Sequence, residues 1–270
     1  MPELPEVETT VRGLAAVLQD AEIARVEMRR PDLRRPMPVD LVQRLTGANI
    51  TALSRRAKYG LISTSRDDVL VFHLGMSGRW RIDPETIGAH DHLLIETRVG
   101  HRLALNDPRR FGSVDLMPAT TLDQWPAFAA MGPEPLGENF NAAYLHAALA
   151  GRAAPIKAML LDQRIVAGLG NIYVCEALNM AGISPFRAAG RIGAARLGLL
   201  VDAIKLVLVQ AIAAGGSTLR DYARPNGELG YFAKDWRVYG REGKACPCGG
   251  TVMRRVQGGR STFYCKDCQR

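Results

Sequence analysis

Residues 49–82 read NITALSRRAKYGLISTSRDDVLVFHLGMSGRWRI, and this stretch decides the fold class of the first half of the chain. It contains four short apolar-rich segments, and four similar segments flank it. Gly, Pro, Asp or Asn separates neighbouring segments, a pattern typical of short β-strands. The eight predicted strands are residues 23–29, 49–55, 60–65, 69–73, 79–82, 92–98, 102–106 and 113–117. Together they predict a β-sandwich or barrel.

Helical patterns lie on both sides of these strands. Residues 2–19 place Val7, Val11, Leu14, Val17 and Leu18 on one stripe, which predicts a leading amphipathic helix. Residues 118–136 are rich in proline, as is typical of a boundary. Beyond residue 141 the period becomes helical, over residues 142–150, 156–161, 171–181 and 189–214. Asn171 follows a glycine-rich turn and is expected to cap the third of these helices.

The sequence therefore predicts an α+β protein in four parts. Residues 1–117 form the strand-rich domain with its leading helix, and residues 118–136 form a linker. Residues 137–240 form a helical domain, and residues 241–270 form a cysteine-bearing hairpin.

Four of the five cysteines lie in this last segment, as Cys246-Pro-Cys248 and Cys265-Lys-Asp-Cys268. Two short cysteine pairs flanking a loop predict a tetrahedral site for one Zn²⁺. A disulfide framework is the alternative, and reduced thiols in a cytoplasmic protein argue against it. The first pair is one residue shorter than the usual Cys-x2-Cys turn. Its backbone N–H groups are therefore not expected to reach the sulfurs in the common geometry.

The charge balance predicts a polyanionic partner. The chain has a net charge of +8 over 270 residues, and seven basic residues against two acidic ones fall within residues 241–270. A solvated charged surface is the simpler explanation of such a run. Basic residues on a metal-stabilised hairpin, however, are a common way to contact nucleic acid. No apolar run approaches the roughly 18–20 residues of a membrane span, so no membrane partner is expected.

The start of the chain, Met1-Pro2-Glu3, carries a potential nucleophile. Removal of Met1 exposes the secondary amine of Pro2, and an amine that attacks a carbonyl-level carbon forms a Schiff base. Glu3 then lies beside the new bond as an acid. The plain alternative is an ordinary processed start whose carboxylate caps a helix.

Eight short motifs, in order along the whole chain, resemble the bacterial formamidopyrimidine-DNA glycosylase family. They lie at residues 2–8, 55–59, 73–78, 90–92, 107–112, 132–136, 168–173 and 262–265, where the sequence reads PELPEVE, RRAKY, HLGMSG, HDH, DPRRFG, GPEPL, GLGNIY and TFYC. The resemblance implies a bifunctional repair enzyme that excises 8-oxoguanine and ring-opened purines and then nicks the abasic strand. It also implies an N-terminal β-sandwich, a helix-two-turns-helix motif and a zinc hairpin, with oxidised double-stranded DNA as the partner of a monomeric enzyme.

The resemblance also implies roles for individual residues. Pro2 matches the nucleophile and Glu3 its acid, while Lys58 matches a proton donor in elimination and Arg260 the hairpin arginine that grips phosphate. Met76, Arg109 and Phe111 match the trio that fills the gap left by a flipped base. The remaining matched DNA contacts are His90, Arg152, Lys157 and Asn171. A surface charge for Lys58, core packing for Met76 and Phe111, and a buried histidine for His90 are the simpler alternatives.

Residues 215–222 match a lesion-recognition loop of the family, whose backbone N–H groups would read the lesion. Two other interpretations stay open. An endonuclease VIII-type glycosylase for oxidised pyrimidines shares the nucleophile and the zinc hairpin, but its start typically reads Pro-Glu-Gly-Pro-Glu, where this chain has Leu4. A non-catalytic zinc-hairpin DNA-binding protein leaves Pro2, Glu3 and Lys58 without a role.

Overall fold

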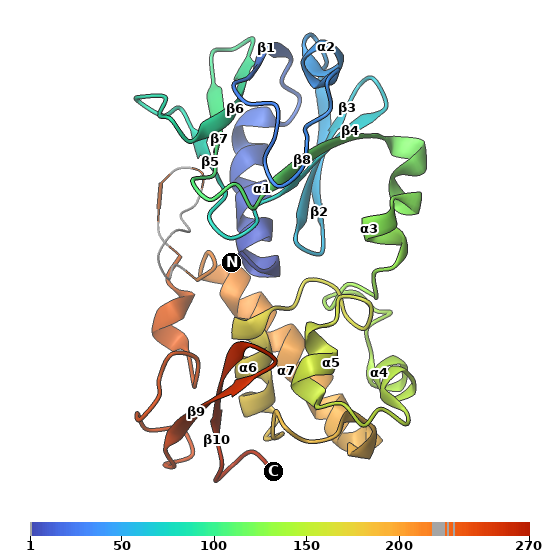
Figure 1. The fold of residues 1–270 in the computed structure, drawn as a ribbon, viewed down its shortest axis with the longest axis vertical. Coiled ribbons are helices and arrows are strands. Elements are labelled where there is room, and N and C mark those ends of the chain that lie inside the picture. Colours follow the sequence, from blue (N-terminus) through green and yellow to red (C-terminus); the bar gives the residue numbers. More distant parts are fainter. Residues whose placement is uncertain (1, 218–224, 226, 229) are drawn as a thin grey trace. The chain divides into compact units, whose positions relative to one another are not determined.

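A computed structural model of the chain describes residues 2–217, 225, 227–228 and 230–270 (Figure 1). These residues form two compact units. The sandwich unit contains the described residues of Met1–Ala129 and Ala214–Ala233, and the hairpin unit contains Ala130–Ala213 and Lys234–Arg270. The chain passes from the first unit to the second for the last time within the 3₁₀ helix η3 (Phe232–Asp235). The four-part domain division at residues 117, 136 and 240 stays a prediction.

The leading helix α1 (Leu4–Leu18) forms as the apolar stripe predicts. Val7, Val11, Leu14 and Leu18 are all buried in the core of the sandwich unit. Burying one face of an amphipathic helix is what stabilises it in a folded protein. Because the helix begins at Leu4, Pro2 and Glu3 stand immediately before its first turn.

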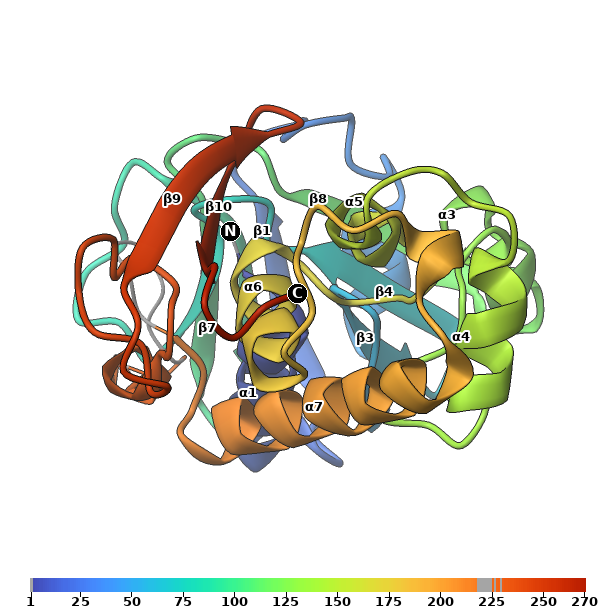
Figure 2. The same ribbon diagram turned by 90° about the horizontal axis from the view of Figure 1, so that it is seen from below.

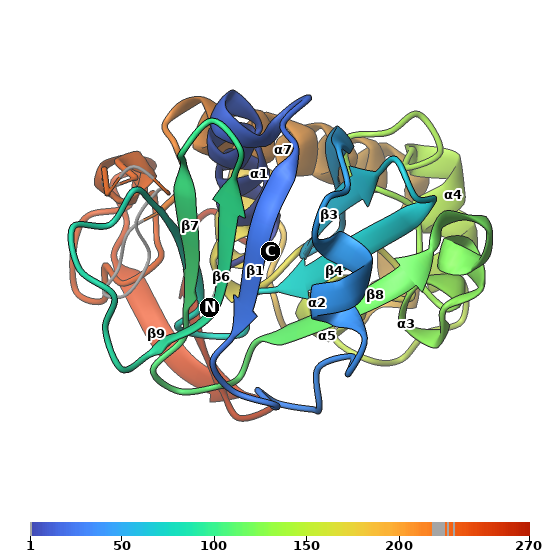
Figure 3. The ribbon, with the colours of Figure 1, turned by 90° about the horizontal axis from the view of Figure 1, so that it is seen from above.

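Two antiparallel four-stranded sheets make up the rest of this unit. In order across the first sheet lie β1 (Ile23–Met28), β6 (Asp91–Thr97), β7 (Arg102–Asn106) and β5 (Arg79–Ile82); in the second lie β2 (Ile50–Arg56), β3 (Tyr59–Thr64), β4 (Asp68–His73) and β8 (Ser113–Pro118). Figure 3 shows β1, β6 and β7 beside one another, and β3, β4 and β8 as a separate group. All eight predicted strands are confirmed to within one residue at each end.

The core between the sheets is apolar and aromatic. Trp80 of β5 and Phe72 of β4 meet edge to face with ring centroids 5.7 Å apart, a favoured aromatic geometry. The short helix α2 (Leu41–Leu45) adds Leu41 and Leu45 to the same cluster. The segment predicted as a linker contains the 3₁₀ helix η1 (Ala119–Gln124) and α3 (Pro126–Ala129). A rigid sandwich with short loops is a scaffold on which loop residues can be held firmly.

The hairpin unit joins helices to one β-hairpin. Its elements are α4 (Ala142–Leu149), α5 (Ile156–Leu161), α6 (Asn171–Met180), η2 (Ala189–Arg191), α7 (Ala194–Ala213), β9 (Val252–Gln257) and β10 (Arg260–Cys265). The helix predicted over residues 189–214 is interrupted at Ile192 and Gly193, and only α7 is α-helical. Figure 2 shows α6 lying between α7 and the hairpin, and α6 contacts both.

Helix α6 is buried along almost its whole length, from Ile172 to Asn179. Polar side chains on such a helix need partners, since an unpaired buried polar group is costly. In the described part of the chain no helix is long and apolar enough to cross a membrane.

Candidate active site and metal centre

Pro2 and Glu3 are held at the first turn of α1 in the sandwich unit. Both are buried, and Glu3 has the extended backbone of an N-cap residue. The backbone N–H of Glu3 donates to Glu6 Oε2 at 2.8 Å, and the Glu3 side chain accepts the N–H of Glu6. This reciprocal pair is a capping box, which fixes the direction in which the chain enters the helix. The Glu3 carboxyl group therefore has a defined position next to Pro2.

Glu6 has a second partner far away in the sequence. Its Oε1 atom accepts the backbone N–H of Ser217 at 2.8 Å, and Glu6 is 2% exposed. The two residues are 211 positions apart in the sequence. Ser217 belongs to the predicted lesion-recognition loop at residues 215–222, of which residues 218–222 lie outside the described residues. One buried carboxylate thus fixes the segment that begins with Pro2 and Glu3 and the part of this loop that the structure describes.

Lys58 lies in the tight turn that joins β2 and β3, where Ala57 has a positive φ of 53°. It is buried, 8% exposed, so its sequence alternative as a surface charge does not describe it. Arg55 fixes the turn because its Nη1 donates to the Ala57 carbonyl at 2.9 Å and its Nε donates to Glu8 of α1 at 3.1 Å. The turn carrying Lys58 is therefore attached to the same helix as Pro2 and Glu3.

His73 is an uncharged neighbour of this lysine. Burial, reinforced by the positive charge of Lys58, lowers the pKa of His73 to about 4. Its Nδ1 accepts the backbone N–H of Gly75 at 3.0 Å, which places the ring proton on Nε2. His73 stacks at a tilt against Tyr59, with ring centroids 4.8 Å apart. The next residues of the chain lead into the loop that carries Met76.

Met76, Arg109 and Phe111 project from two neighbouring loops of the sandwich unit. Met76 is 39% exposed and Phe111 45% exposed, so neither is a core residue. The guanidinium of Arg109 lies 4.9 Å from the centre of the Phe111 ring, a cation–π contact. At Gly75, with φ of +62°, a Cβ atom would stand 2.3 Å from the Phe111 backbone. Only glycine lets the two loops approach this closely.

The buried carboxylate of Asp107 holds together the loop that carries Met76 and the loop that carries Arg109 and Phe111. Its Oδ1 accepts the Ser77 hydroxyl at 2.6 Å and its Oδ2 accepts the Gly112 N–H at 2.8 Å. The same Ser77 oxygen accepts the N–H of Arg109 at 3.2 Å. Asp107 is 1% exposed. Sequence reasoning missed this residue, although an Asp-Pro step closed by Gly112 is a turn signal that could have pointed to it.

His90 is exposed, whereas the buried histidine of this motif is His92. His92 Nε2 bonds to the Asp107 carbonyl at 3.0 Å, and the His90 carbonyl accepts the Asp107 N–H at 2.9 Å. Between them, Asp91 is bound by Arg81 at 2.8 Å and by the Gly88 N–H at 2.7 Å. His90 thus stands on the surface of the same loop cluster as Arg109.

In the hairpin unit, Lys157 and Asn171 converge on one backbone carbonyl. Lys157 Nζ donates to the Ser261 carbonyl at 3.2 Å and to Thr262 Oγ1 at 2.7 Å, while Asn171 Nδ2 donates to the same carbonyl at 2.9 Å. Lys157 is 1% exposed, and this burial lowers its pKa. Both residues, predicted as phosphate contacts, hold strand β10 in place.

The expectation that Asn171 caps α6 is wrong. The N-cap is Gly170, with φ of −134° and ψ of −163°, and Asn171 is the first helical residue. Its side chain reaches the hairpin, and Gln163 holds the glycine-rich turn before it. Gln163 accepts the Gly168 N–H at 2.8 Å and donates to the Leu169 carbonyl at 3.0 Å.

Arg260 begins strand β10 and stays exposed, next to the turn at Gly258 and Gly259. A pocket of about 480 Å³ opens beside it, lined by Pro155, Lys157, Ala158, Leu161, Asp162, Gln257, Gly258 and Arg260. Two cationic side chains and one carboxylate, Asp162, thus line this open pocket. Arg152 is exposed after α4 and does not line this pocket.

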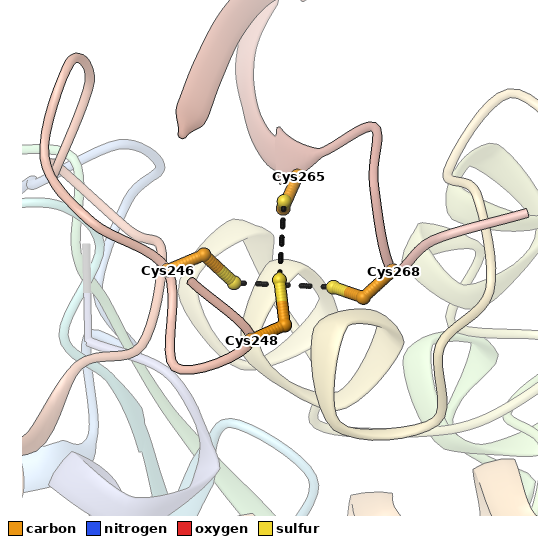
Figure 4. A group of neighbouring side chains, drawn as sticks. All are labelled: Cys246, Cys248, Cys265 and Cys268. Carbon is orange, nitrogen blue, oxygen red and sulfur yellow. Dashed lines mark hydrogen bonds between the residues drawn. The ribbon is translucent and has the colours of Figure 1, made fainter. Parts of the chain in front are cut away.

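The four cysteines of the hairpin converge as their spacing predicts. Their Sγ atoms all lie within 4.8 Å of one another, with Cys246 and Cys268 at 3.9 Å and Cys248 and Cys265 at 3.6 Å (Figure 4). A tetrahedral ion with metal–sulfur bonds of about 2.3 Å separates its sulfurs by about 3.8 Å. The four thiols therefore fit a metal ion.

The thiols differ in acidity because their surroundings differ. A hydrogen bond from the Gly250 backbone, with help from Cys246, lowers the pKa of Cys248 to about 7. Burial raises the pKa of Cys265 and, together with the neighbouring sulfurs, that of Cys268. A metal ion binds thiolates, so a metal ion bound here would displace the protons of these thiols. Cys175 lies buried beside them, in the apolar cluster with Val238 and Val252, as a small hydrophobic residue.

Comparison with known proteins finds matches to one family over the whole length of the chain. Residues 1–114 match the model of the formamidopyrimidine-DNA glycosylase N-terminal domain, and residues 131–223 match the model of the H2TH domain of the same enzymes. The formamidopyrimidine-DNA glycosylase of Rhizorhabdus wittichii is 69% identical over 270 residues, and that of Zymomonas mobilis is 55% identical, each over 100% of both chains.

Solved structures of the same family are similar to this chain as well. The complex of Lactococcus lactis Fpg with DNA containing an abasic site is similar over 100% of both chains, with a TM-score of 0.92 and 34% identity. The MutM (Fpg) protein of Thermus thermophilus covers 99% of this chain, with a TM-score of 0.89 and 39% identity. By its two matched domains, its full-length relatives and its fold, the chain belongs to the formamidopyrimidine-DNA glycosylase family, whose members are DNA glycosylases of base excision repair with AP lyase activity.

Proposed function

We propose that this protein excises oxidised purines, such as 8-oxoguanine and formamidopyrimidines, from double-stranded DNA and then cleaves the abasic strand. The observation that carries the proposal is the N-terminal arrangement, in which the capping box places Glu3 beside Pro2. Two structures of the Lactococcus lactis relative, with abasic-site DNA and with N7-benzyl-Fapy-dG DNA, support the substrate class. The enzyme is proposed to act as a cytoplasmic monomer.

The proposed nucleophile is the Pro2 amine, freed by removal of Met1. An α-amino group has a pKa of roughly 8, so an appreciable fraction is unprotonated near neutral pH. Its lone pair attacks C1′ of the damaged nucleotide, the bond from C1′ to the base breaks, and the amine loses its proton. The C1′–O4′ bond then breaks, with Glu3 protonating the ring oxygen, and the nitrogen lone pair forms an iminium with C1′. The resulting iminium acidifies the hydrogens at C2′. Loss of one of them permits β-elimination of the 3′ phosphate and then δ-elimination of the 5′ phosphate, so one amine serves both activities.

The remaining catalytic residues are assigned by chemistry. Glu3 protonates the ring oxygen of the sugar as the C1′–O4′ bond breaks. Lys58, buried in the turn that is attached to α1, donates a proton during β-elimination. Arg260 binds the phosphates beside the lesion, because a guanidinium stays protonated and suits anion binding better than proton transfer.

Base flipping leaves a gap in the duplex that must be filled. Met76 and Phe111 fill it, and Arg109 hydrogen-bonds the orphaned cytosine; the exposure of all three on loops fixed by Asp107 supports this assignment. His90, Arg152, Lys157 and Asn171 are assigned to the DNA backbone. Lys157 Nζ donates two of its three N–H groups to Ser261 and Thr262, and the third N–H group is assigned to a phosphate in the pocket beside Arg260.

We assign one Zn²⁺ to Cys246, Cys248, Cys265 and Cys268. A four-thiolate set at tetrahedral spacing is typical of structural zinc. When bound, the ion supplies cross-linking of the hairpin and no chemistry on the substrate. Lys157 and Asn171 then hold the same hairpin from the helical side, through the carbonyl next to Arg260.

Borohydride trapping tests the nucleophile. Incubation with a duplex containing 8-oxoguanine opposite cytosine should give a covalent protein–DNA adduct, and peptide mapping should place it on Pro2 of a protein whose mass lacks Met1. An adduct on Lys58, or a retained Met1, would refute the assignment. Preferential excision of oxidised pyrimidines would favour an endonuclease VIII-type specificity, and absence of any adduct would favour a DNA-binding protein without chemistry.

A further inference from the structure

The first cysteine pair of the hairpin lacks room for the usual backbone support of its sulfurs. In metal-binding turns, backbone N–H groups two and three residues beyond a cysteine commonly donate to its sulfur. Here Pro247 is the single residue between the two cysteines, so the residue two positions beyond Cys246 is Cys248 itself, and among the described residues no hydrogen bond joins the Cys248 N–H to Cys246 Sγ. The N–H of Gly249, three residues after Cys246, donates to the Cys246 carbonyl at 2.9 Å instead.

Two of the other sulfurs, those of Cys248 and Cys265, have backbone donors. The Cys265 thiol is bonded by the backbone of Asp267 and Cys268, two and three residues further on. The Cys248 thiol is bonded by the backbone of Gly250, again two residues further on. Backbone donors therefore reach one cysteine of each pair, Cys248 and Cys265.

A side chain from helix α6 reaches the sulfurs at this point. Asn179 Nδ2 lies 3.6 Å from Cys246 Sγ and 3.7 Å from Cys268 Sγ, within the range of N–H···S hydrogen bonds. Asn179 is 4% exposed, near the end of a helix whose other buried positions are mostly apolar. A buried amide is retained in such a place only where its groups are paired.

The orientation of this amide is set by its other partners. Arg237 Nε donates to Asn179 Oδ1 at 3.0 Å, and since a guanidinium has no acceptor, Nδ2 must face the sulfurs. The second Nδ2 hydrogen donates to Gln269 Oε1 at 3.2 Å, which also accepts the Cys265 N–H at 2.8 Å. Gln269 is fixed in turn by the Ile183 carbonyl at 2.9 Å.

Arg237 itself is held by the same helix. The Glu176 carboxylate, one turn before Asn179, accepts the backbone N–H groups of Arg237, Val238 and Tyr239 at 2.8, 3.0 and 2.8 Å. Glu176 is 1% exposed. Helix α6 thus fixes the segment leading into the hairpin through Glu176 and the sulfurs through Asn179.

We propose that Asn179 is a positioning residue of the metal centre, whose side-chain amide supplies to Cys246 the N–H donor that the shortened Cys246-Pro-Cys248 turn does not give, and donates to Cys268 of the second pair as well. The proposal rests on the zinc site proposed above. It assigns a metal-tuning role to a residue of the DNA-binding helical region that is not itself a ligand. Arg237 and Gln269 hold the amide in this orientation.

Zinc release and cobalt spectroscopy test the proposal on the full-length protein. Asn179→Leu has nearly the same shape and no donor, and the matched control Asn139→Leu makes the same change at an exposed asparagine of the same unit. Loss of outer hydrogen bonds to metal ligands costs about 10–100-fold in metal affinity. We therefore expect at least about tenfold faster zinc transfer to a chromogenic chelator in Asn179→Leu, and wild-type transfer in Asn139→Leu.

The Co²⁺-substituted protein provides a readout that general destabilisation does not move. Hydrogen bonds lower the energy of the sulfur lone pairs, so their loss should shift the sulfur-to-cobalt charge-transfer band of the folded variant to longer wavelength. Asn179→Asp keeps an oxygen for Arg237 but has no donor, and it should shift the band in the same direction. It serves as the second variant where Asn179→Leu does not fold.

Insertion of one glycine after Pro247 restores a Cys-x2-Cys turn and links the amide to the short turn specifically. In that background Asn179→Leu should change the zinc-transfer rate much less than in the natural chain. An equal effect in both backgrounds, or unchanged transfer and spectra in both Asn179 variants of a zinc-containing protein, would overturn this proposal alone. Wild-type protein purified under reducing conditions without zinc would overturn the zinc assignment and this proposal together.

Discussion

Glu3 combines a structural task with its proposed catalytic one, and the two can be separated by a single substitution. Glu3→Gln keeps an oxygen that can accept the Glu6 N–H, so the capping box and α1 should remain. It removes the carboxylic acid. We expect excision of 8-oxoguanine to fall by at least about 100-fold, the usual contribution of a general acid.

Cleavage of a preformed abasic site should decrease much less in this variant, because the Pro2 amine can still condense with an aldehyde. Gel assays on the two substrates measure both steps, with helical content from circular dichroism as the control. Equal losses on the two substrates would place Glu3 in the elimination steps as well as in base loss.

His73 makes the stability of the protein depend on pH. Its folded pKa of about 4 lies below the ordinary value of 6.5. Between these values the unfolded chain binds more protons than the folded one, so stability should fall as pH decreases from 6.5 to 4. His73→Asn keeps an acceptor for the Gly75 N–H and does not titrate. It should reduce the slope of the free energy of unfolding against pH by up to about 1.4 kcal/mol per pH unit in this window.

Denaturant unfolding at a series of pH values measures this slope. His101→Asn is the matched control, because His101 is a partly exposed histidine of the same unit, paired with Asp83. Equal slopes in wild type and His73→Asn between pH 6.5 and 4 would show that His73 is not held neutral by the fold.

At the scale of elements, the β9–β10 hairpin depends on contacts at its two ends. The cysteines fix one end, and Lys157 and Asn171 fix the backbone next to Arg260 at the other. Cys268→Ser removes one ligand from the metal centre. We expect DNA affinity and abasic-strand nicking to decrease together by at least about tenfold, or ~1.4 kcal/mol in binding.

The sandwich unit has its own core and should keep its stability in this variant. Binding titrations, nicking assays and thermal unfolding followed by near-ultraviolet dichroism of Trp80 and its neighbours compare the two effects. A loss of DNA affinity without metal loss would mean that Cys268 acts through its local chain geometry.

The elements themselves follow closely from the sequence. Each strand of residues 23–117 was predicted because its apolar residues and its turn residues are local in the chain, and the structure confirms them. The partners of the buried polar groups are not local. Asn179 meets Arg237 and Gln269 at separations of 58 and 90 residues, and Glu6 meets Ser217 at 211. No short pattern encodes such pairs.

For the same reason, the structural surroundings of several site residues could not be predicted. Lys157 reads as a surface cation, and its burial follows only from Ser261 and Thr262, more than 100 residues later. Asp107 looks like a turn residue, yet it fixes two loops. A polar residue inside a predicted buried helix, as at Asn179, is a signal that could have marked a candidate positioning residue.

At the scale of the whole molecule, the net charge of +8 predicts an electrostatic contribution to the free energy of DNA binding that is the same for every duplex. A cation that binds phosphate adds to this contribution without regard to sequence. Arg152→Gln, at an exposed position after α4, should weaken binding to damaged and undamaged duplexes alike. It should also reduce the slope of log affinity against log salt concentration by roughly one unit.

Arg109 also contributes to the net positive charge, but its substitution should have a different effect, because Arg109 is proposed to bind the orphaned cytosine. Arg109→Ala should flatten the preference for 8-oxoguanine opposite cytosine over adenine by ~1–3 kcal/mol, the range of a good base contact. Excision rates on the two duplexes, with Arg152→Gln as the reference for a pure phosphate contact, measure the difference. If Arg109→Ala slowed both substrates equally and kept their ratio, Arg109 would be another backbone contact, and the choice of opposite base would have to come from Met76 or Phe111.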